Sequence, residues 1–562
     1  MRRLILIATV PALLLAGCAG GAPPPSSATG LPVVGESAYG LFLAGGAAMN
    51  AGRNSEAARF LELARAGGGD DPAIVERAFT SALLAGDVKT AAAIAPEGAE
   101  VSEPARRLGR LVKAVAALAD GKGAAAREAL GSEPLGFPHR SVSALLGPWF
   151  AAAAGDAEGA VVRPQVRGDA AVDYFGKIGQ AHLFERARRY DEAETDFKAV
   201  TGGGSPSELA VLAYGAFLER RGRRPEALAL YDAGIGRNPA SLGLAQARAR
   251  AATGRGAPNA PSLKEGAAFA LLAPAATMLS AKQDQVALAY LRLALTLDPQ
   301  RNDAWLMLGD VLQQRGDSEG ARAAYAKPKP NSPEYPSAQA KLAWSHQSAG
   351  DKTTAIRLAR AGAETGDLEA RATLADLLRA NSEFDEAIII LTGLINEAKS
   401  PDWRLFYARG QANERSGRWT AAEADLSKAL ALRPDESELL NYLGYAWIDR
   451  GERLDEAKGM IEKALAANPR SGAIVDSLGW AYFRKGDYAK AVELLEQAVE
   501  LEAGDPEINN HLGDAYWMVG RKDEAGFQWR RVLTLDPDAK MRADAEAKIA
   551  GGLGPKPRVA GP

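Results

Sequence analysis

Residues 472–500 read GAIVDSLGWAYFRKGDYAKAVELLEQAVE. In the first half of this stretch, Val475, Leu478 and Tyr482 follow one another at i, i+3 and i+7, the spacing of one face of an amphipathic helix. Gly486 then supplies the conformation that commonly ends a helix, and a second apolar pattern follows. The stretch therefore predicts two helices joined by a short turn.

The same pattern recurs about every 34 residues, in two registers. One register is an alanine near the start of each second helix: Ala287, Ala321, Ala355, Ala387, Ala422, Ala457, Ala491 and Ala525. The other is a small residue in each first helix: Ala275, Gly309, Ala343, Ala375, Gly410, Gly444, Gly479 and Gly513. Small residues at both places let the two helices approach closely.

A helix–turn–helix repeat of this length is typical of the tetratricopeptide repeat (TPR), and we identify the chain as a member of that family. The expected fold class is all-α, a TPR α-solenoid in which the repeats form a right-handed superhelix. Each repeat leaves an apolar face that the next must cover, so many repeats share one continuous core.

Weaker copies extend toward the N-terminus, and glycines and prolines between residues 254 and 261 interrupt the period. We therefore expect a joint between two solenoids. The predicted organisation is a lipoprotein signal peptide at 1–17, a flexible tether at 18–31, a degenerate N-terminal solenoid at 32–241, a joint at 242–267, a C-terminal TPR solenoid at 268–540 and a flexible tail at 541–562.

The composition disfavours several functional classes. The 562 residues include 67 Lys and Arg against 70 Asp and Glu, so a net charge of −3 offers no general attraction to nucleic acid. One cysteine and four histidines leave few metal ligands, and phosphate-loop, HExxH and GxSxG motifs are absent from the sequence. We expect no enzyme activity, no cofactor, no metal and no small-molecule substrate.

The first residues have the order of a secretory signal. Arg2 and Arg3 precede an apolar run from Leu4 to Leu15, which at about twelve residues is too short to span a membrane. The next residues complete the sequence Leu-Ala-Gly-Cys, ending at Cys18, which resembles the lipobox of bacterial lipoproteins. The resemblance implies that Cys18 is lipidated and that the chain is anchored in the bacterial envelope, at the periplasm-facing side of the outer membrane.

Aromatic and polar residues recur where the TPR frame places the inner surface of the superhelix. The expected ring-bearing positions are Trp344, Tyr445, Trp480, Phe483 and Trp517. The accompanying polar positions are Tyr407, Asn441, Asp476, Asn510 and Asp514. We interpret these ten residues as a peptide-binding groove. The alternative is that the rings pack between neighbouring first helices and stiffen the superhelix.

A basic cluster at residues 220–224 has two interpretations. It could contact an anionic lipid or glycan, but we favour a solvated turn between helices.

Segments 402–410, 441–445 and 476–480 resemble long TPR lipoproteins of Gram-negative bacteria. That group includes periplasmic adaptors that bind a carboxyl-terminal processing protease and present cell-wall hydrolases to it. The resemblance implies a tethered scaffold that binds proteins, either periplasmic enzymes or subunits of an envelope complex. A structural component of an export, pilus or outer-membrane assembly complex is the alternative. An enzyme hidden in the irregular region from Arg163 to Gly204, or in the joint, is a third possibility.

Overall fold

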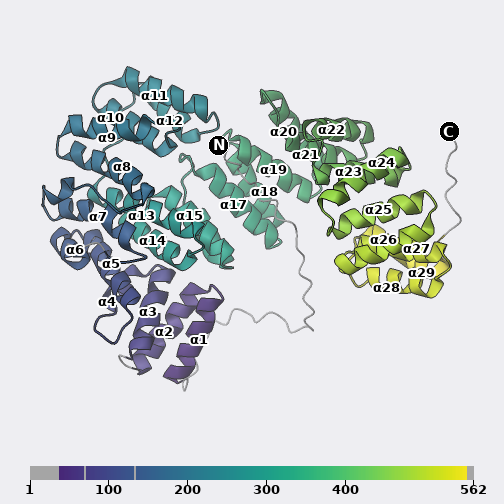
Figure 1. Cartoon of the computed structure of the whole chain (residues 1–562), viewed down its shortest axis with the longest axis horizontal. Coiled ribbons are helices and arrows are strands. Elements are labelled where there is room, and N and C mark those ends of the chain that lie inside the picture. The colour runs from purple at the N-terminus through teal and green to yellow at the C-terminus, as the bar shows by residue number, and fades with distance from the viewer. Residues whose placement is uncertain (1–36, 69–70, 132–134, 554–562) are drawn as a thin grey trace. The chain divides into compact units, whose positions relative to one another are not determined.

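A computed structural model describes residues 37–68, 71–131 and 135–553. About 75% of the chain is helical, and the described residues contain 29 α-helices and no strand (Figure 1). The predicted all-α TPR class is confirmed. Within the described segments, no helix is long and apolar enough to cross a membrane. The predicted signal peptide, Cys18 and the tether lie outside the described residues.

The described helices fall into two compact units, which meet in sequence between Leu377 and Leu378. The N-terminal unit contains α1 (Ala38–Asn50), α2 (Asn54–Gly68), α3 (Pro72–Ala85), α4 (Val88–Ala93), α5 (Glu103–Ala119), α6 (Gly123–Leu130), α7 (Arg140–Ala153), α8 (Ala170–Arg186), α9 (Tyr190–Thr201), α10 (Glu208–Arg220), α11 (Arg224–Arg237), α12 (Leu242–Ala252), α13 (Leu263–Ser280), α14 (Asp284–Leu297), α15 (Asn302–Gln314), α16 (Ser318–Tyr325), α17 (Tyr335–Ser348) and α18 (Lys352–Ala363). Helix α19 (Leu368–Ala380) contains the boundary. The C-terminal unit continues with α20 (Phe384–Glu397), α21 (Trp403–Arg415), α22 (Trp419–Leu432), α23 (Ser437–Arg450), α24 (Leu454–Ala467), α25 (Gly472–Arg484), α26 (Tyr488–Leu501), α27 (Pro506–Met518), α28 (Lys522–Val532) and α29 (Ala539–Gly551).

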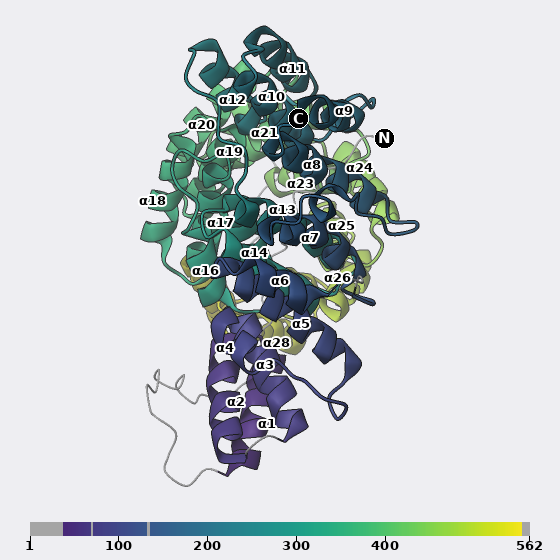
Figure 2. The ribbon, with the colours of Figure 1, turned by 90° about the vertical axis from the view of Figure 1, so that its left-hand side faces the viewer.

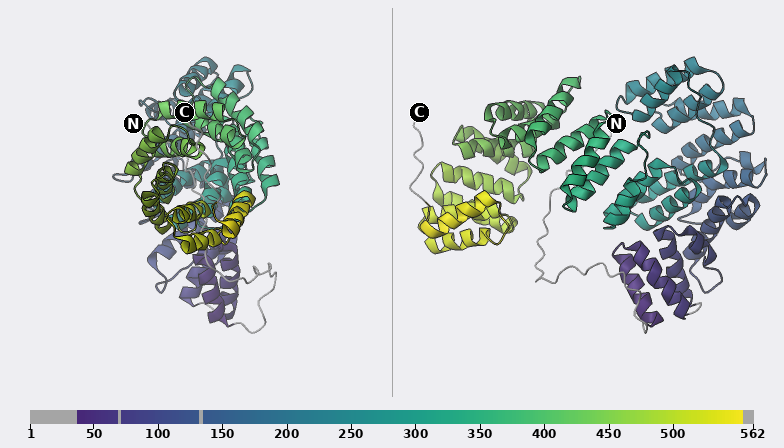
Figure 3. Two further views of the ribbon diagram at one scale, coloured as in Figure 1. Left: turned by 90° about the vertical axis from the view of Figure 1, so that its right-hand side faces the viewer. Right: turned by 180° about the vertical axis from the view of Figure 1, so that it is seen from behind.

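The hairpin of α25 and α26 shows why the repeat needs its small residues. A Cβ atom added to Gly479 would lie 2.8 Å from the Leu495 side chain, so the close approach of the two helices depends on glycine. Ala491 opposite is fully buried. The turn passes through Gly486 with φ +87°, a left-handed conformation that favours glycine. Paired helices of the same kind recur as hairpins α21–α22, α23–α24 and α27–α28, in the green to yellow part of the chain (Figure 3).

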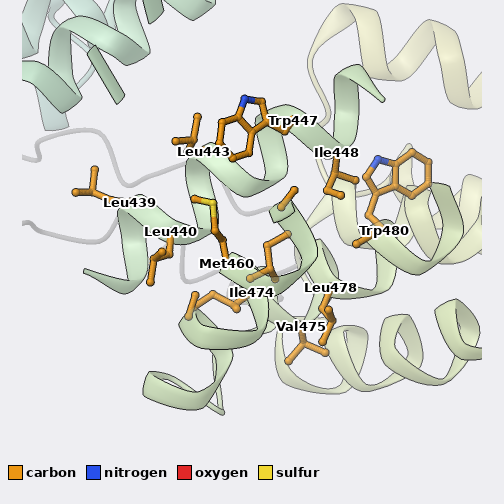
Figure 4. Packing of buried hydrophobic residues seen from close by; sticks show 14 of the residues in the cluster. Leu439, Leu440, Leu443, Trp447, Ile448, Met460, Ile474, Val475, Leu478 and Trp480 are labelled. Carbon is orange, nitrogen blue, oxygen red and sulfur yellow. The ribbon is translucent and has the colours of Figure 1, made fainter. Parts of the chain in front are cut away.

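The apolar core of the C-terminal unit runs from one hairpin into the next. Leu443 and Trp447 of α23, Met460 of α24 and Val475 of α25 belong to one buried cluster (Figure 4). Each hairpin thus covers the apolar face of the hairpin before it, as expected for a solenoid.

The N-terminal unit departs from a simple stack because α13 and α14 pack against helices far earlier in the chain. Helix α13 contacts α7 and α8, and α14 contacts α3, α4 and α5 (Figure 2). The imidazole Nδ1 of His139 lies 2.8 Å from the hydroxyl of Tyr290, and Arg292 Nε donates to the carbonyl oxygen of Leu84 at 3.1 Å. Helix α13 is apolar on nearly every side, which is typical of a helix enclosed by neighbours.

The predicted joint at 242–267 therefore differs from the structure. Its first residues form α12 and its last residues begin α13, both within the N-terminal unit. The connecting loop is held by Arg220, which donates to the carbonyl oxygen of Pro258 at 2.8 Å, and by Arg186, which donates to that of Pro261 at 3.4 Å. The glycines and prolines interrupt the period without ending the packed unit, because α13 buries its apolar surface against α7.

The predicted flexible tail at 541–562 also differs from the structure in its first residues, 541–551, which are helical. Residues up to Gly551 belong to α29, which packs against α28. Asp538 caps this helix, accepting a hydrogen bond from the backbone N–H of Met541 at 2.7 Å. Because Lys548 and Ile549 pack against the last hairpin, α29 is ordered by tertiary contacts rather than by its own sequence pattern.

Candidate functional site

The predicted groove residues of the C-terminal unit lie on α21, α23, α25 and α27, the first helices of successive repeats. Most of them are covered. Asp476, Trp480 and Asp514 are buried, with 5%, 9% and 4% of their surface exposed, and Tyr407 is buried with its hydroxyl donating to Glu438 at 3.0 Å. Residues at predicted groove positions therefore contact other helices of the same unit.

Stacked aromatic rings cover the inner surface of the repeats around α25. The indole of Trp480 lies between the ring of Phe483, at a centroid distance of 4.5 Å, and the imidazole of His511 on α27, at 4.0 Å. The planes are inclined by 8° and 12°, so both contacts are face to face. The ring of Tyr445 on α23 lies 6.3 Å from His511.

Tyr445 also reaches past α25 to the second repeat beyond its own. Its hydroxyl donates to Glu507 Oε1 on α27 at 2.5 Å. Every residue of α25 from Ile474 to Ala481 is buried. The interpretation of Asp476 and Trp480 as groove-lining residues is therefore corrected: in this structure the rings pack between first helices, as the alternative interpretation proposed.

Helix α29 covers the last repeat in the same way. Lys548 Nζ donates to Asn510 Oδ1 at 3.1 Å and to Asp514 Oδ2 at 2.9 Å. Trp529 Nε1 donates to the other oxygen of Asp514 at 2.9 Å. The half-buried ring of Trp517 packs near the C-terminal end of α29. The carboxylate and amide predicted to bind a peptide thus bind a lysine of the same chain.

Charged groups concentrate in this buried region. Burial by itself lowers the pKa of His511, but the carboxylates of Asp476, Glu507 and Asp514 outweigh burial and raise that pKa above its ordinary value. Burial raises the pKa of Asp514, although the ammonium of Lys548 opposes the change. His511, Lys548 and Glu507 are not among the predicted groove residues, because their partners Asp476, Asp514 and Tyr445 lie on other helices.

Trp344 is the predicted groove residue that remains open in the N-terminal unit. It lies on α17 with 41% of its surface exposed. One turn earlier on the same helix face, Lys341 Nζ pairs with Asp310 Oδ1 of α15 at 2.8 Å. Asp310 also accepts a hydrogen bond from Tyr325 at 2.8 Å. We call Asp310, Lys341 and Trp344 the Trp344 surface: an exposed indole beside an oriented ion pair.

Two remaining predicted groove residues are neither fully buried nor fully exposed. Asn441 is half-buried on α23, one turn before Tyr445, and Phe483 is half-buried at the end of the ring stack. Neither forms an open aromatic surface comparable to that of Trp344.

The basic cluster at 220–224 is largely engaged in contacts within the chain. Arg220 forms two hydrogen bonds to the buried carboxylate of Glu185, Arg221 lies over the ring of Tyr190, and Arg223 pairs with Glu194. These contacts favour the structural interpretation of the cluster. Among the described residues, no group of three or more His, Cys, Asp or Glu side chains is placed to hold a metal ion.

Comparisons with known proteins agree with the helical repeat. A family model described as tetratricopeptide repeat matches residues 178–241, 285–336 and 407–472, and one described as TPR repeat matches 479–520. No curated protein matches the chain significantly. The fold defines a helical-repeat protein of the kind that binds other proteins. Its repeats are tetratricopeptide repeats.

Several solved structures share this repeat. MamA from Desulfovibrio magneticus is 21% identical, covering 30% of this chain and 94% of its own, with a TM-score of 0.27. A thermophilic TPR protein from Thermus thermophilus is 24% identical, covering 33% and 99%, with a TM-score of 0.30. A TPR protein from Parabacteroides merdae is 17% identical, covering 38% and 85%, with a TM-score of 0.33. At these TM-scores, none of them bears on what this chain binds.

Proposed function

We propose that this protein is a lipid-anchored scaffold of the bacterial envelope that binds periplasmic proteins through the first helices of its TPR repeats. The repeats support protein binding, since TPR proteins bind protein partners. The order of residues 1–18 supports the anchor. A scaffold of this kind raises the effective concentration of two partners held together, without chemistry of its own.

The observation that carries the proposal is the exposure of Trp344. An indole with 41% of its surface exposed is a large apolar group that water does not stabilise. Tryptophan is one of the residue types that contribute most to protein interfaces. By contrast, the corresponding indole of Trp480 is already covered by His511 and Phe483.

The partner class to test first is suggested by the resemblance to TPR lipoproteins of Gram-negative bacteria. It consists of a carboxyl-terminal processing protease and the cell-wall hydrolases on which such a protease acts. Both are periplasmic enzymes, and a scaffold anchored at the outer membrane would face them.

We expect Trp344→Ala to weaken capture of periplasmic partners by the full chain. Loss of an interface tryptophan typically costs about 2 kcal/mol, or roughly thirtyfold in affinity. The measurement is affinity capture from an envelope extract, followed by binding of the purified processing protease or wall hydrolase that is recovered.

Phe527→Ala is the matched control for this experiment. Phe527 is also an exposed aromatic residue, with 59% of its surface exposed, but it lies on α28, the second helix of its repeat. Capture should be unchanged in this variant. Equal capture by both variants and the unaltered chain would rule out the Trp344 surface as the binding site.

We expect Cys18→Ser to release the protein from membranes, because a serine hydroxyl does not replace the cysteine thiol in lipid attachment. The measurement is the fraction that sediments with membranes after a high-salt wash, which removes proteins held by charge alone. Arg2→Lys is the control, since it keeps the charge of the signal. Continued sedimentation of the serine variant would contradict the lipid anchor.

A further inference from the structure

The C-terminal unit holds a buried histidine at the point where three first helices meet. His511 Nδ1 lies 3.0 Å from both carboxylate oxygens of Asp476, and the two side chains are 7% and 6% exposed. With a carboxylate at that distance, Nδ1 carries a hydrogen and donates it. His511 therefore links α27 to α25 by a hydrogen bond enclosed in protein.

The same imidazole supports the rings that close the inner surface. One face of it stacks on Trp480 of α25, and Tyr445 of α23 lies beside it. Tyr445 is itself held to α27 by its hydrogen bond to Glu507. Helices α23, α25 and α27 thus meet at one side chain, although they belong to three successive repeats.

The groups that face His511 carry more negative charge than positive charge. Carboxylates face it from α25 (Asp476) and from its own helix (Glu507 and Asp514). Tyr445 of α23 contributes a neutral hydroxyl, and α28 contributes the indole N–H of Trp529 to Asp514. The ammonium of Lys548 on α29 lies 2.9 Å from Asp514 and 2.7 Å from Asp544. A positive charge on His511 is therefore needed to balance Asp476, because Lys548 is engaged with other carboxylates.

We propose that protonated His511 is a latch that keeps the inner surface of α23, α25 and α27 closed, and that loss of its proton at higher pH loosens the contact between α25 and α27. Without the proton's charge, Asp476 is a buried carboxylate that is paired with no cation among the described residues. The surface that opens includes Trp480 and Asp476, the residues whose repeat positions favour contact with a peptide.

The sign of the pH dependence follows from the raised pKa of His511. Stability contributed by a histidine of this kind is fully present below its ordinary pKa of about 6.5. It is lost as the pH rises through the higher pKa of the folded chain. The latch is closed below the ordinary histidine pKa and opens as the pH rises through the raised pKa of His511 in the folded chain, independently of which partner the protein binds.

The full chain labelled at its four histidine rings allows a direct titration by nuclear magnetic resonance. We expect the His511 signal to lose its proton above the ordinary histidine value. His139 and His182 serve as internal references, because burial lowers the pKa of both, that of His139 to about 4. The His511 signal is assigned as the one that disappears in His511→Asn. If that variant does not fold, the His511 signal is the one whose chemical shift changes in Asp476→Asn.

Hydrogen exchange of the full chain tests whether titration opens the structure. After correction for intrinsic exchange, we expect protection of the backbone amides in α25 and α27 to fall over the pH range in which His511 titrates. The expected fall is tenfold for each pH unit between the ordinary histidine pKa and the pKa of His511 in the folded chain. Protection in α13 should not follow this titration. Asp476→Asn should remove the pH dependence of α25 and α27.

His346→Asn is the matched control, since His346 also faces a carboxylate, that of Asp351 at 3.3 Å, but at the surface of α17. It should leave the pH dependence of α25 and α27 unchanged. The proposal is overturned if His511 titrates at or below the ordinary value, if protection does not follow its titration, or if Asp476→Asn keeps the same pH dependence.

Discussion

Gly266→Ala is expected to destabilise the N-terminal unit by about 3 kcal/mol or more, at the upper end of what overpacking in a core costs. A Cβ atom on residue 266 would lie 2.1 Å from two ring carbons of Trp149. Trp149 is itself only 2% exposed, so its ring has little space in which to move. Helix α13 must therefore shift away from α7, which separates the two surfaces that hold the unit together.

The free energy of unfolding of the N-terminal unit measures this effect, followed by hydrogen exchange in α7 and α13. Gly236→Ala is the matched control. Gly236 is an exposed glycine of α11 with no neighbouring atom within 4 Å of an added Cβ. Alanine there should be neutral or stabilising by up to about 1 kcal/mol, because it favours the helix. A Gly266 variant as stable as this control would show that α13 does not pack against Trp149.

Lys548→Met is expected to destabilise the C-terminal unit by about 3 kcal/mol near neutral pH, the effect of leaving a buried charge without its partner. The Lys548 side chain is 11% exposed and that of Asp514 is 6% exposed. Methionine matches the length of the lysine stem but offers no charge. Asp514 must then either stay charged inside the protein or take up a proton, and both cost free energy.

Hydrogen exchange in α27, α28 and α29 measures this loss. Lys540→Met is the control, since Lys540 is an exposed lysine of the same helix. Adding Asp514→Asn to the Lys548 variant should recover most of the stability, because asparagine carries no charge and still accepts the hydrogen bond from Trp529. Full stability of the single variant would mean that α29 does not depend on this ion pair.

The helical hairpins were predictable because their causes are local. The spacing of apolar residues at i, i+3 and i+7 predicts a helix wherever it occurs, and Gly479 and Ala491 predict close approach within one hairpin. Contacts between distant parts of the chain leave no such pattern. Lys264 on α13 donates to the carbonyl oxygen of Ala119, 145 residues earlier, so the sequence alone suggested a joint where the structure continues one packed unit.

Helix α29 escaped prediction for a related reason. Its sequence is rich in alanine and charged residues and ends near glycines and prolines, which is also the composition of a frayed terminus. Its position is set by Lys548, whose partners Asn510 and Asp514 lie more than thirty residues earlier.

The sequence by itself determined the repeat and the all-α class, because these depend on residue spacing within one hairpin. Only the tertiary structure decided which positions are open. Trp344 and Trp480 occupy the same place in their repeats, yet one is 41% exposed and the other 9%. The difference arises because His511 and Phe483 cover Trp480, and His511 belongs to a neighbouring repeat. Exposure at such a position depends on side chains that neighbouring repeats contribute, which the period of a single repeat does not encode.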